Sequence, residues 1–362
     1  MHLLSKYEAL DFIARRANLL DDPANPVNPF GTSAWILHFI DQVATKEWTI
    51  VIPEAVREGK ALMLLCQRTR SAKNCSALSN YYASLFSPLV CASAQRANAA
   101  SELVRQLTDL RPRRSTIDLA PLDRHGSDTT WVSNGFRSYG WYVRQYACFG
   151  NWYLPCAGVS FDAYMETRDS QLRNTWKRKS KKLLAAGRID VITDISDVEA
   201  GMDAYDAVYA KSWKRPEPYP NFVRGWARIC AERGWLRLGI ATVADKPVAV
   251  QFWIAYGSRA YIFKLAYDEG ESQWSAGTVL TAHMIRHALE IDRVFEIDYL
   301  TGDDEYKKTW MTHRRERVGL KACNLRSLQG SSAAAVEFGG HWRGRLRDWM
   351  TERLVRPAPA GR

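Results

Sequence analysis

The sequence contains no long run of apolar residues. None of its apolar stretches approaches the roughly 18 residues that a membrane-spanning helix requires. Residues 1–16 mix acidic and basic side chains too early for the apolar core of a secretory signal. We therefore expect a cytoplasmic protein. A peripheral position at the inner face of the membrane stays open as an alternative.

Cysteine is scarce and scattered. The seven cysteines form no C-x-x-C pair and their number is odd, so neither a disulfide framework nor a cysteine zinc site is indicated. His283 and His287 are four residues apart, a spacing that can bind zinc. Met284 stands where the HExxH motif has glutamate, however. We expect no bound metal.

The composition is otherwise that of a globular protein, with 46% hydrophobic and 25% charged residues, which excludes disorder of the whole chain. At roughly 150 residues per domain, 362 residues correspond to about two domains. The 50 basic residues outnumber the 39 acidic ones, giving a net charge of +11. This excess favours an anionic partner, such as a nucleotide cofactor, RNA, an acidic glycan or a membrane surface.

The two halves of the chain show a similar order of predicted elements. An amphipathic helix and a strand at 94–123 parallel a helix and a strand at 277–302. Gly59 followed by KALMLLC also parallels Gly234 followed by WLRLGIA. A repeat of this length indicates a duplicated domain, because solenoid units span roughly 20–50 residues. Three consecutive strands are predicted in the second half, at 235–243, 246–256 and 259–268.

Several segments between about Ser160 and Gly319 resemble one known family. These are SFDAYMETRDSQLRNTWKRKSKKLLAAG, KPVAVQFWIAYGSRAYIFKLAYDE, SAGTVLTAHMIRHALE and FEIDYLTGDDEYKKTW. The last contains a D-x-L-x-G-x-x-x-Y-K pattern made by Asp298, Leu300, Gly302, Tyr306 and Lys307. Together they resemble the GNAT-superfamily acyltransferase domain of CelD-like or BioF2-like proteins, a group related to the Fem aminoacyl transferases.

The resemblance implies an α/β (α+β) fold of two tandem GNAT-like domains, each a mixed central sheet flanked by helices. We expect them at 1–155 and 156–330, followed by a basic helix and tail at 331–362. The implied activity is transfer of an acyl group from acyl-CoA, or another activated donor, to an amine or hydroxyl. The implied acceptor is a glycan or amine-bearing precursor of the cell envelope or of an exopolysaccharide.

The expected donor site is the start of the helix at 275–291. GNAT enzymes cradle the CoA pyrophosphate with an (R/Q)-x-x-G-x-(G/A) loop at a helix N-terminus, where backbone amides and the helix dipole favour anions. Here Gln273 and Gly277 are four residues apart rather than three. This departure leaves open an aminoacyl-tRNA donor or a non-catalytic scaffold in a polysaccharide-assembly complex. The expected cofactor-binding residues are Gln273, Ser275, Ala276, Gly277 and Thr278.

Acyl transfer needs a base, an oxyanion stabiliser and often an acid, and the resemblance places them at the ends of the two central strands. Asp298 is the first candidate base, with a structural ion pair as the alternative. Strict alternation puts Lys264 on the face opposite Tyr267, and a lysine inside an apolar strand is costly unless it is paired or functional. The expected catalytic residues are Asp298, Tyr306, Lys264 and Asp303, and the expected substrate-binding residues are Tyr267, Asp268, Trp213, Lys307 and Arg178.

Two basic segments are candidates for contact with a polyanion. The cluster at 168–188 contains Trp176 among its lysines and arginines, a composition typical of RNA binding with one stacking ring. The CoA 3′-phosphate and an anionic glycan are alternative partners, and a solvated helix face is the usual explanation of such a charge run. The tail at 341–356 also combines basic residues with tryptophan, which suits either an anionic membrane surface or a docking helix. We expect no DNA partner.

Overall fold

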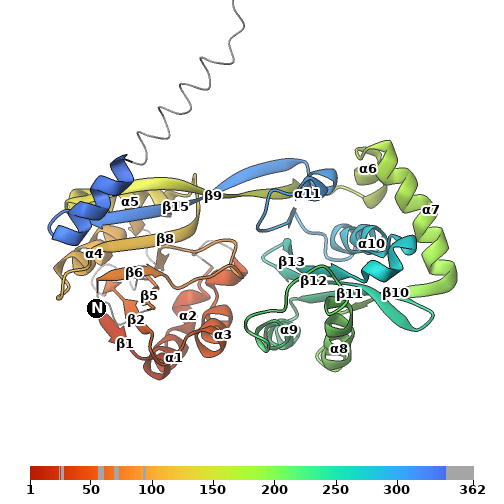
Figure 1. Ribbon diagram of the computed structural model, residues 1–362, viewed down its shortest axis with the longest axis horizontal. Helices are drawn as coiled ribbons and strands as arrows, with labels where there is room; N and C mark the ends of the chain where they lie inside the picture. The colour runs from red at the N-terminus through yellow and green to blue at the C-terminus, as the bar shows by residue number, and fades with distance from the viewer. Residues whose placement is uncertain (24, 26–27, 56–60, 69–72, 93–94, 340–362) are drawn as a thin grey trace, which may run out of the picture.

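The computed structural model describes residues 1–23, 25, 28–55, 61–68, 73–92 and 95–339. Within these residues, twelve strands form one mixed sheet through the whole molecule, with helices on both faces (Figure 1). This confirms the predicted mixed α/β class. The spatial order is β1 (His2–Leu4), β2 (Thr49–Ile52), β5 (Leu65–Gln67), β6 (Asn74–Ala77), β8 (Thr116–Asp123), β15 (His313–Asn324), β9 (Trp141–Pro155), β14 (Glu296–Asp298), β13 (Arg259–Tyr267), β12 (Lys246–Tyr256), β11 (Leu236–Val243) and β10 (Gly187–Ile192).

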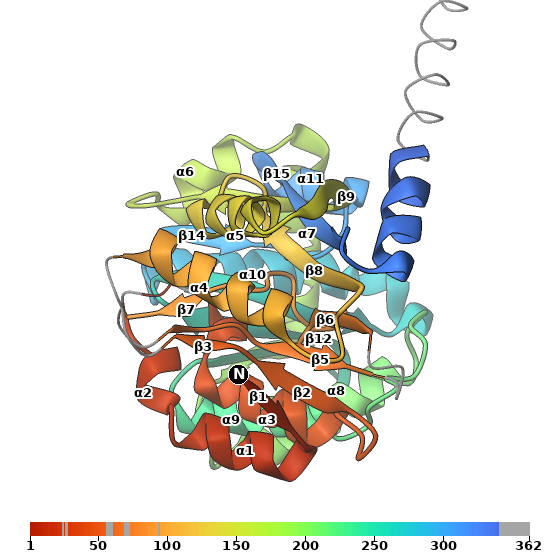
Figure 2. The ribbon, with the colours of Figure 1, turned by 90° about the vertical axis from the view of Figure 1, so that its left-hand side faces the viewer.

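Helices cover the sheet in both halves. The helices of the first half are α1 (Lys6–Ala14), α2 (Ala17–Leu20), α3 (Ser33–Val43), α4 (Arg96–Asp109) and α5 (Ser127–Ser138). Those of the second half are α6 (Phe161–Glu166), α7 (Ser170–Ala186), α8 (Val198–Tyr209), α9 (Phe222–Glu232), α10 (Ala276–Glu290) and α11 (Glu305–Trp310). In the second half, α8 and α9 lie on one face, and α6, α7 and α10 lie on the other (Figure 1). In the first half, α1 and α3 lie below the sheet and α4 and α5 above it (Figure 2).

Each half contains one parallel strand pair, and a similar helix precedes it. The pair is β6–β8 in the first half and β13–β14 in the second, and α4 and α10 precede β8 and β14. The predicted repeat of helix and strand is therefore confirmed. The parallel between the segments after Gly59 and Gly234 is wrong, because β5 occupies the place of β12 rather than that of β11. Gly59 itself lies outside the described residues.

Two long antiparallel strands, β9 and β15, join the halves. Their pairing runs from Trp141 opposite Asn324 to Tyr153 opposite His313. At one end β15 pairs with β8, and at the other end β9 pairs with β14. The two halves therefore share a single sheet. The boundaries at 1–155 and 156–330 stay predictions.

Some predicted segments differ from the structure, and one lies partly outside the described residues. The strands β2 and β15 fall where no strand is expected from the sequence. Of the helix and strand predicted at 277–302, the strand is reduced to β14. Of the predicted tail at 331–362, residues up to 339 continue a helix that begins at 328, and 340–362 lie outside the described residues. Among the described residues, no helix has the length and apolarity needed to cross a membrane.

An aromatic seam packs the first half against the second. Trp35 of α3 contacts Trp226 of α9, with ring centroids 4.9 Å apart. The imidazole of His38, also on α3, lies 2.8 Å from the carbonyl oxygen of Phe222. The ring of Tyr82, from the loop after β6, stacks on Phe222 at 4.1 Å. This packing fixes the Tyr82 loop beside β13.

Candidate functional site

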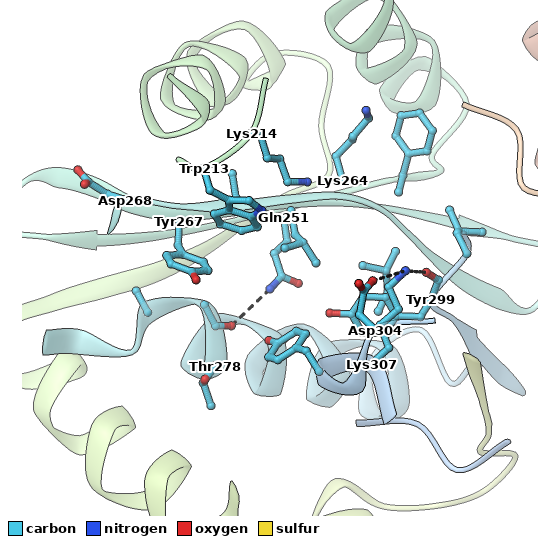
Figure 3. Close-up of a pocket in the computed structure, with 18 of the residues that line it drawn as sticks. Trp213, Lys214, Gln251, Lys264, Tyr267, Asp268, Thr278, Tyr299, Asp304 and Lys307 are labelled. Carbon is cyan, nitrogen blue, oxygen red and sulfur yellow. Dashed lines mark hydrogen bonds and ion pairs between the residues drawn. The ribbon is translucent and has the colours of Figure 1, made fainter. Parts of the chain in front are cut away.

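The parallel strands β13 and β14 separate after three residue pairs, from Arg259–Glu296 to Tyr261–Asp298. Beyond Tyr261, β13 continues to Tyr267 while β14 has ended. A cavity of about 720 Å³ occupies the gap between the separated segments (Figure 3). The site therefore forms where the sheet opens, next to the start of α10.

A bulge in β13 shapes the wall of the cavity. Phe252 of β12 pairs with Lys264 and Trp253 pairs with Ile262, so Phe263 is an extra residue. Bulges re-aim side chains and often occur beside active sites. Because this bulge precedes Lys264, alternation is kept from there onward, and Lys264 and Tyr267 point to opposite faces as the sequence predicts (Figure 3).

The structure brings most of the predicted site residues to one cavity. Ten of them line it: Tyr306, Lys264, Ser275, Ala276, Gly277, Thr278, Tyr267, Asp268, Trp213 and Lys307. Asp298, Asp303, Gln273 and Arg178 do not. The lining also includes residues that the sequence did not indicate, above all Tyr81, Tyr82, Lys214, Gln251 and Asp304.

The N-terminus of α10 opens on the cavity without a side-chain cap. Its N-cap residue, Ser275, adopts a left-handed conformation with φ of 49° and makes no side-chain capping bond. The first amides of a helix need hydrogen-bond partners and attract anions. A Cβ atom on Gly277 would lie 3.1 Å from the ring of Tyr267. Glycine at this position therefore leaves space between the start of α10 and that ring. This cradle fits a phosphate group of a bound donor.

Asp298 is held in a buried structural network outside the cavity lining. Its carboxylate accepts hydrogen bonds from the Asn151 amide (2.6 Å) and the Leu300 backbone amide (2.7 Å), and it pairs with Arg315. The residue is only 2% exposed. Both carboxylate oxygens are therefore engaged. These contacts match the structural ion pair that the sequence leaves as the alternative, and the role of Asp298 as the base stays a prediction.

The other predicted residues outside the lining also have partners or lie apart. Asp303 pairs with Arg314 at 2.6 Å and accepts from the Trp152 indole at 2.8 Å. The hydrogen bond with Arg314 lowers the pKa of Asp303. The backbone oxygen of Gln273 accepts from Lys179 at 2.6 Å. Arg178 is exposed on α7.

Tyr306 and Lys307 approach the cavity from α11. The Tyr306 hydroxyl lies 3.1 Å from the Thr281 hydroxyl of α10, and burial raises the pKa of Tyr306. Lys307 lies 3.7 Å from Asp304 and donates to the carbonyl oxygens of Tyr299 and Thr301. Lys307 thus braces the turn after β14, and Tyr306 stays protonated at neutral pH.

Lys264 forms a partly buried ion pair with Glu217, a carboxylate that also binds a side chain of the first half. Its ammonium group contacts Glu217, and the Tyr82 hydroxyl donates to the same carboxylate at 2.7 Å. Although burial opposes ionisation, the hydrogen bond and charge of Lys264 lower the pKa of Glu217. Tyr209 also donates to Glu217, at 3.0 Å. Lys264 is therefore paired, and the segment that carries Glu217 is anchored to both halves.

Lys214 lies in the segment between α8 and α9, on the wall of the cavity. Burial, followed by the charge of Lys264, lowers the pKa of Lys214 to about 8. Within the described part of the chain, its ammonium group makes no hydrogen bond or ion pair, and it lies 5.6 Å from the Trp213 ring centroid. The Trp213 ring in turn packs on Tyr267, with centroids 4.6 Å apart.

The basic helix α7 packs beside the mouth of the cavity. Lys182 lies 4.6 Å from the ring of Trp274, in the turn Glu269–Trp274 that precedes α10. Trp176 is turned inward, 5.3 Å from Phe161, so it is not the free stacking ring that the sequence suggests. Among the described residues, Lys177, Arg178 and Lys181 have no recorded ion pair and are exposed. The described residues also gather no group of three potential metal ligands.

Comparisons with known proteins agree with this architecture. Residues 170–308 match the family model described as the acetyltransferase (GNAT) domain. The chain has a GNAT-type, Fem-like fold. The structure of FemX aligns with a TM-score of 0.59 at 10% identity, covering 90% of this chain and 97% of that one. A comparison with curated proteins finds no match.

Two further solved structures share the fold. One is the C-terminal DUF2156 domain of a putative lysylphosphatidylglycerol synthetase from Agrobacterium fabrum, with a TM-score of 0.55, 10% identity, and coverage of 90% and 95% of the two chains. The other is a conserved protein of unknown function from Bacteroides thetaiotaomicron VPI-5482. It aligns with a TM-score of 0.56 at 10% identity, covering 87% of this chain and 97% of that one. At these identities the likeness concerns the fold alone. The narrower resemblance to CelD-like or BioF2-like proteins stays a prediction.

Proposed function

We propose that the protein is a transferase that moves an acyl or aminoacyl group from an activated donor to an amine or hydroxyl. The observation that carries this proposal is the cavity between β13 and β14, onto which the uncapped N-terminus of α10 opens. The GNAT match over 170–308 supports it. On the sequence resemblance, we propose a cell-envelope or exopolysaccharide precursor as the acceptor.

The donor end of the cavity is the α10 side. Ser275 to Thr278 line it there, and their position at the helix start suits the phosphates of an acyl-CoA. An acyl-CoA would supply a thioester carbonyl as the activated group. Within the described residues, β13 has no strand partner on the β14 side beyond Tyr261, so backbone amides there are free to stabilise an oxyanion. The proposed proton donor to the leaving group is Tyr306, whose side chain lines the cavity.

A thermal-shift titration with CoA, acetyl-CoA and longer acyl-CoAs tests the donor. A ligand at 100 times its dissociation constant should add about 2.7 kcal/mol of stability. We expect a saturable rise in Tm that varies with the acyl chain. Absence of a shift with every CoA species contradicts an acyl-CoA donor. If no tRNA binds either, the scaffold alternative is favoured.

The exposed cations of α7 favour a second candidate, an aminoacyl-tRNA donor. Lys177, Arg178 and Lys181 lie on the helix that contacts the turn before α10. Phosphate contacts release counterions, so tRNA binding would weaken steeply with salt. The charge-reversal variant Lys177→Glu/Lys181→Glu should lower both tRNA affinity and its salt dependence. Binding that is indifferent to salt and to these changes excludes this candidate.

A further inference from the structure

The cavity reaches both faces of the sheet. On one face it is lined by the start of α10, and on the other by Tyr81, Tyr82 and Lys214. Figure 3 shows Lys214 and Thr278 on opposite sides of β13. If the proposed donor occupies the α10 side, the acceptor approaches from the Lys214 side. The chemistry of that second face then indicates the acceptor.

We propose that the acceptor carries an anionic group, a carboxylate or a phosphate, that pairs with the ammonium group of Lys214. The role of this ligand as the acceptor rests on the proposed transferase function. The anion site itself rests on the lining of the cavity, and it is tested without a donor.

Lys214 is the member of a lysine cluster that lacks a counter-charge. Three lysines line the cavity: Lys214, Lys264 and Lys307. Lys264 pairs with Glu217, and Lys307 lies 3.7 Å from Asp304. Among the described residues, no carboxylate pairs with Lys214. A partly buried charge without a partner is unfavourable, so an anion bound beside it gains more than at an exposed lysine.

Aromatic rings line the cavity near Lys214: Trp213 lies 5.6 Å from its ammonium group, and Tyr81 and Tyr82 lie 5.8 and 4.7 Å from that of Lys264. Trp213 packs on Tyr267, and Tyr81 packs on Tyr82 with centroids 4.3 Å apart. Rings of this kind hold the apolar face of a small metabolite or sugar while a few polar groups fix its orientation. An acceptor with a ring or short carbon frame and one anionic group matches both features.

The Lys214 segment is rigidly attached. Glu217, three residues later, accepts hydrogen bonds from Tyr82 and Tyr209 and pairs with Lys264. The Tyr209 hydroxyl also donates to the Arg215 carbonyl oxygen at 2.9 Å. These contacts hold the backbone that carries Lys214 beside the cavity before a ligand arrives, which lowers the ordering cost of binding.

The affinity for such an anion should depend on pH. Lys214 has a pKa of about 8 in the free protein, so its positive charge is present below that pH and is lost above it. The charged groups that face it are Lys264 on β13, Lys307 on α11 and Glu217 on its own segment. Burial also lowers the pKa of Lys264 and of Lys307, so any loss of their charge at high pH weakens anion binding in the same direction.

The test compares four probes by calorimetric titration at fixed salt: inorganic phosphate, glucose, glucuronate and glucose 6-phosphate. We expect a charged probe to bind the wild-type protein and glucose to bind more weakly or not at all. Lys214→Met should lower the affinity for the charged probe at least about tenfold, and Lys214→Arg should retain most of it. Raising the pH from 7 to 9 should weaken binding of glucuronate, whose carboxylate stays ionised throughout, more strongly in wild type than in Lys214→Met.

Lys246→Met is the matched control, since Lys246 is exposed at the start of β12 and outside the cavity. Equal affinities in wild type and Lys214→Met overturn the proposal, as does failure of every charged probe to bind wild type. Preference for glucuronate or for glucose 6-phosphate decides between a carboxylate and a phosphate. If Lys214-dependent binding persists but no donor binds, the transferase proposal fails and the anion site stands; the reverse result removes the anion site alone.

Discussion

The carboxylate of Glu217 lies 2.7 Å from the hydroxyl of Tyr82, although 135 residues separate them in the chain. Tyr82 belongs to the first half and Glu217 to the segment that carries Trp213 and Lys214. The cavity is therefore built by both halves. The first half contributes directly to the wall on the proposed acceptor side.

Glu217→Gln should destabilise the protein by about 2 kcal/mol, because it leaves the partly buried Lys264 without its counter-charge. The lowered pKa of Glu217 adds a pH dependence. Its stabilisation is fully present above the ordinary value of 4.5 and is lost as the pH falls through the lowered pKa. Urea unfolding of both proteins between pH 3 and 7 measures this. A gap between wild type and variant that stays constant on acidification contradicts the prediction.

Asp298→Asn should cost roughly 3 kcal/mol of stability, because it breaks a buried ion pair with Arg315. Glu296→Gln is the matched control, since Glu296 also pairs with Arg315 but is more exposed. Chemical denaturation of the two variants gives the difference. A stable Asp298→Asn protein that has lost transfer activity would instead support Asp298 as the base.

Ser275→Asp should weaken binding of CoA about tenfold or more, because it places a negative charge at the start of α10 where the donor phosphates are proposed to bind. The variant should keep or slightly gain stability, since a carboxylate suits a helix N-terminus. Ser275→Asn, which tolerates the left-handed conformation, is the neutral control. Parallel CoA titrations and melting curves separate the effect on affinity from the effect on stability. Equal CoA affinities in the Asp and Asn variants would mean that the donor does not bind at the start of α10.

Gly277→Ala should reduce donor affinity by pressing on the Tyr267 ring, which a Cβ atom would approach to 3.1 Å. Alanine in place of glycine normally stabilises a helix by about 0.5–1 kcal/mol. Gly339→Ala, where a Cβ atom meets nothing within 4 Å, is the control without such a contact. Thermal melting and CoA titration of both variants provide the comparison. Undiminished donor binding by Gly277→Ala would mean that the donor does not bind between Gly277 and the Tyr267 ring.

The long elements of the second half are predictable because their hydrophobic periodicity is regular. The helix α10 begins and ends within one residue of the bounds predicted at 275–291. The strand β15 is missed for a physical reason. Its arginines read as a solvated surface, yet Arg317 is 3% exposed and Arg315 pairs with Glu296 and Asp298.

The candidate site divides in the same way. The site residues of β13 and α10 can be predicted from the sequence, because the strand and the helix are consecutive and both belong to the segments that resemble the GNAT domain. Tyr82 and Lys214 are missed because their partners are distant in sequence, and because a lysine near several prolines looks like part of a solvated turn. Asp298 is located correctly at the end of β14, but its partners Asn151 and Arg315 come from β9 and β15, which local patterns cannot reveal.

The position of β15 also has a consequence for synthesis of the protein. It is the last strand of the described chain, yet it lies between β8 and β9. While the ribosome is still making the second half, the first half therefore exposes the unpaired edges of both strands, and such edges favour aggregation. Domains usually fold in order from the N-terminus during translation. Here the sheet of the first half is completed only when residue 324 has emerged.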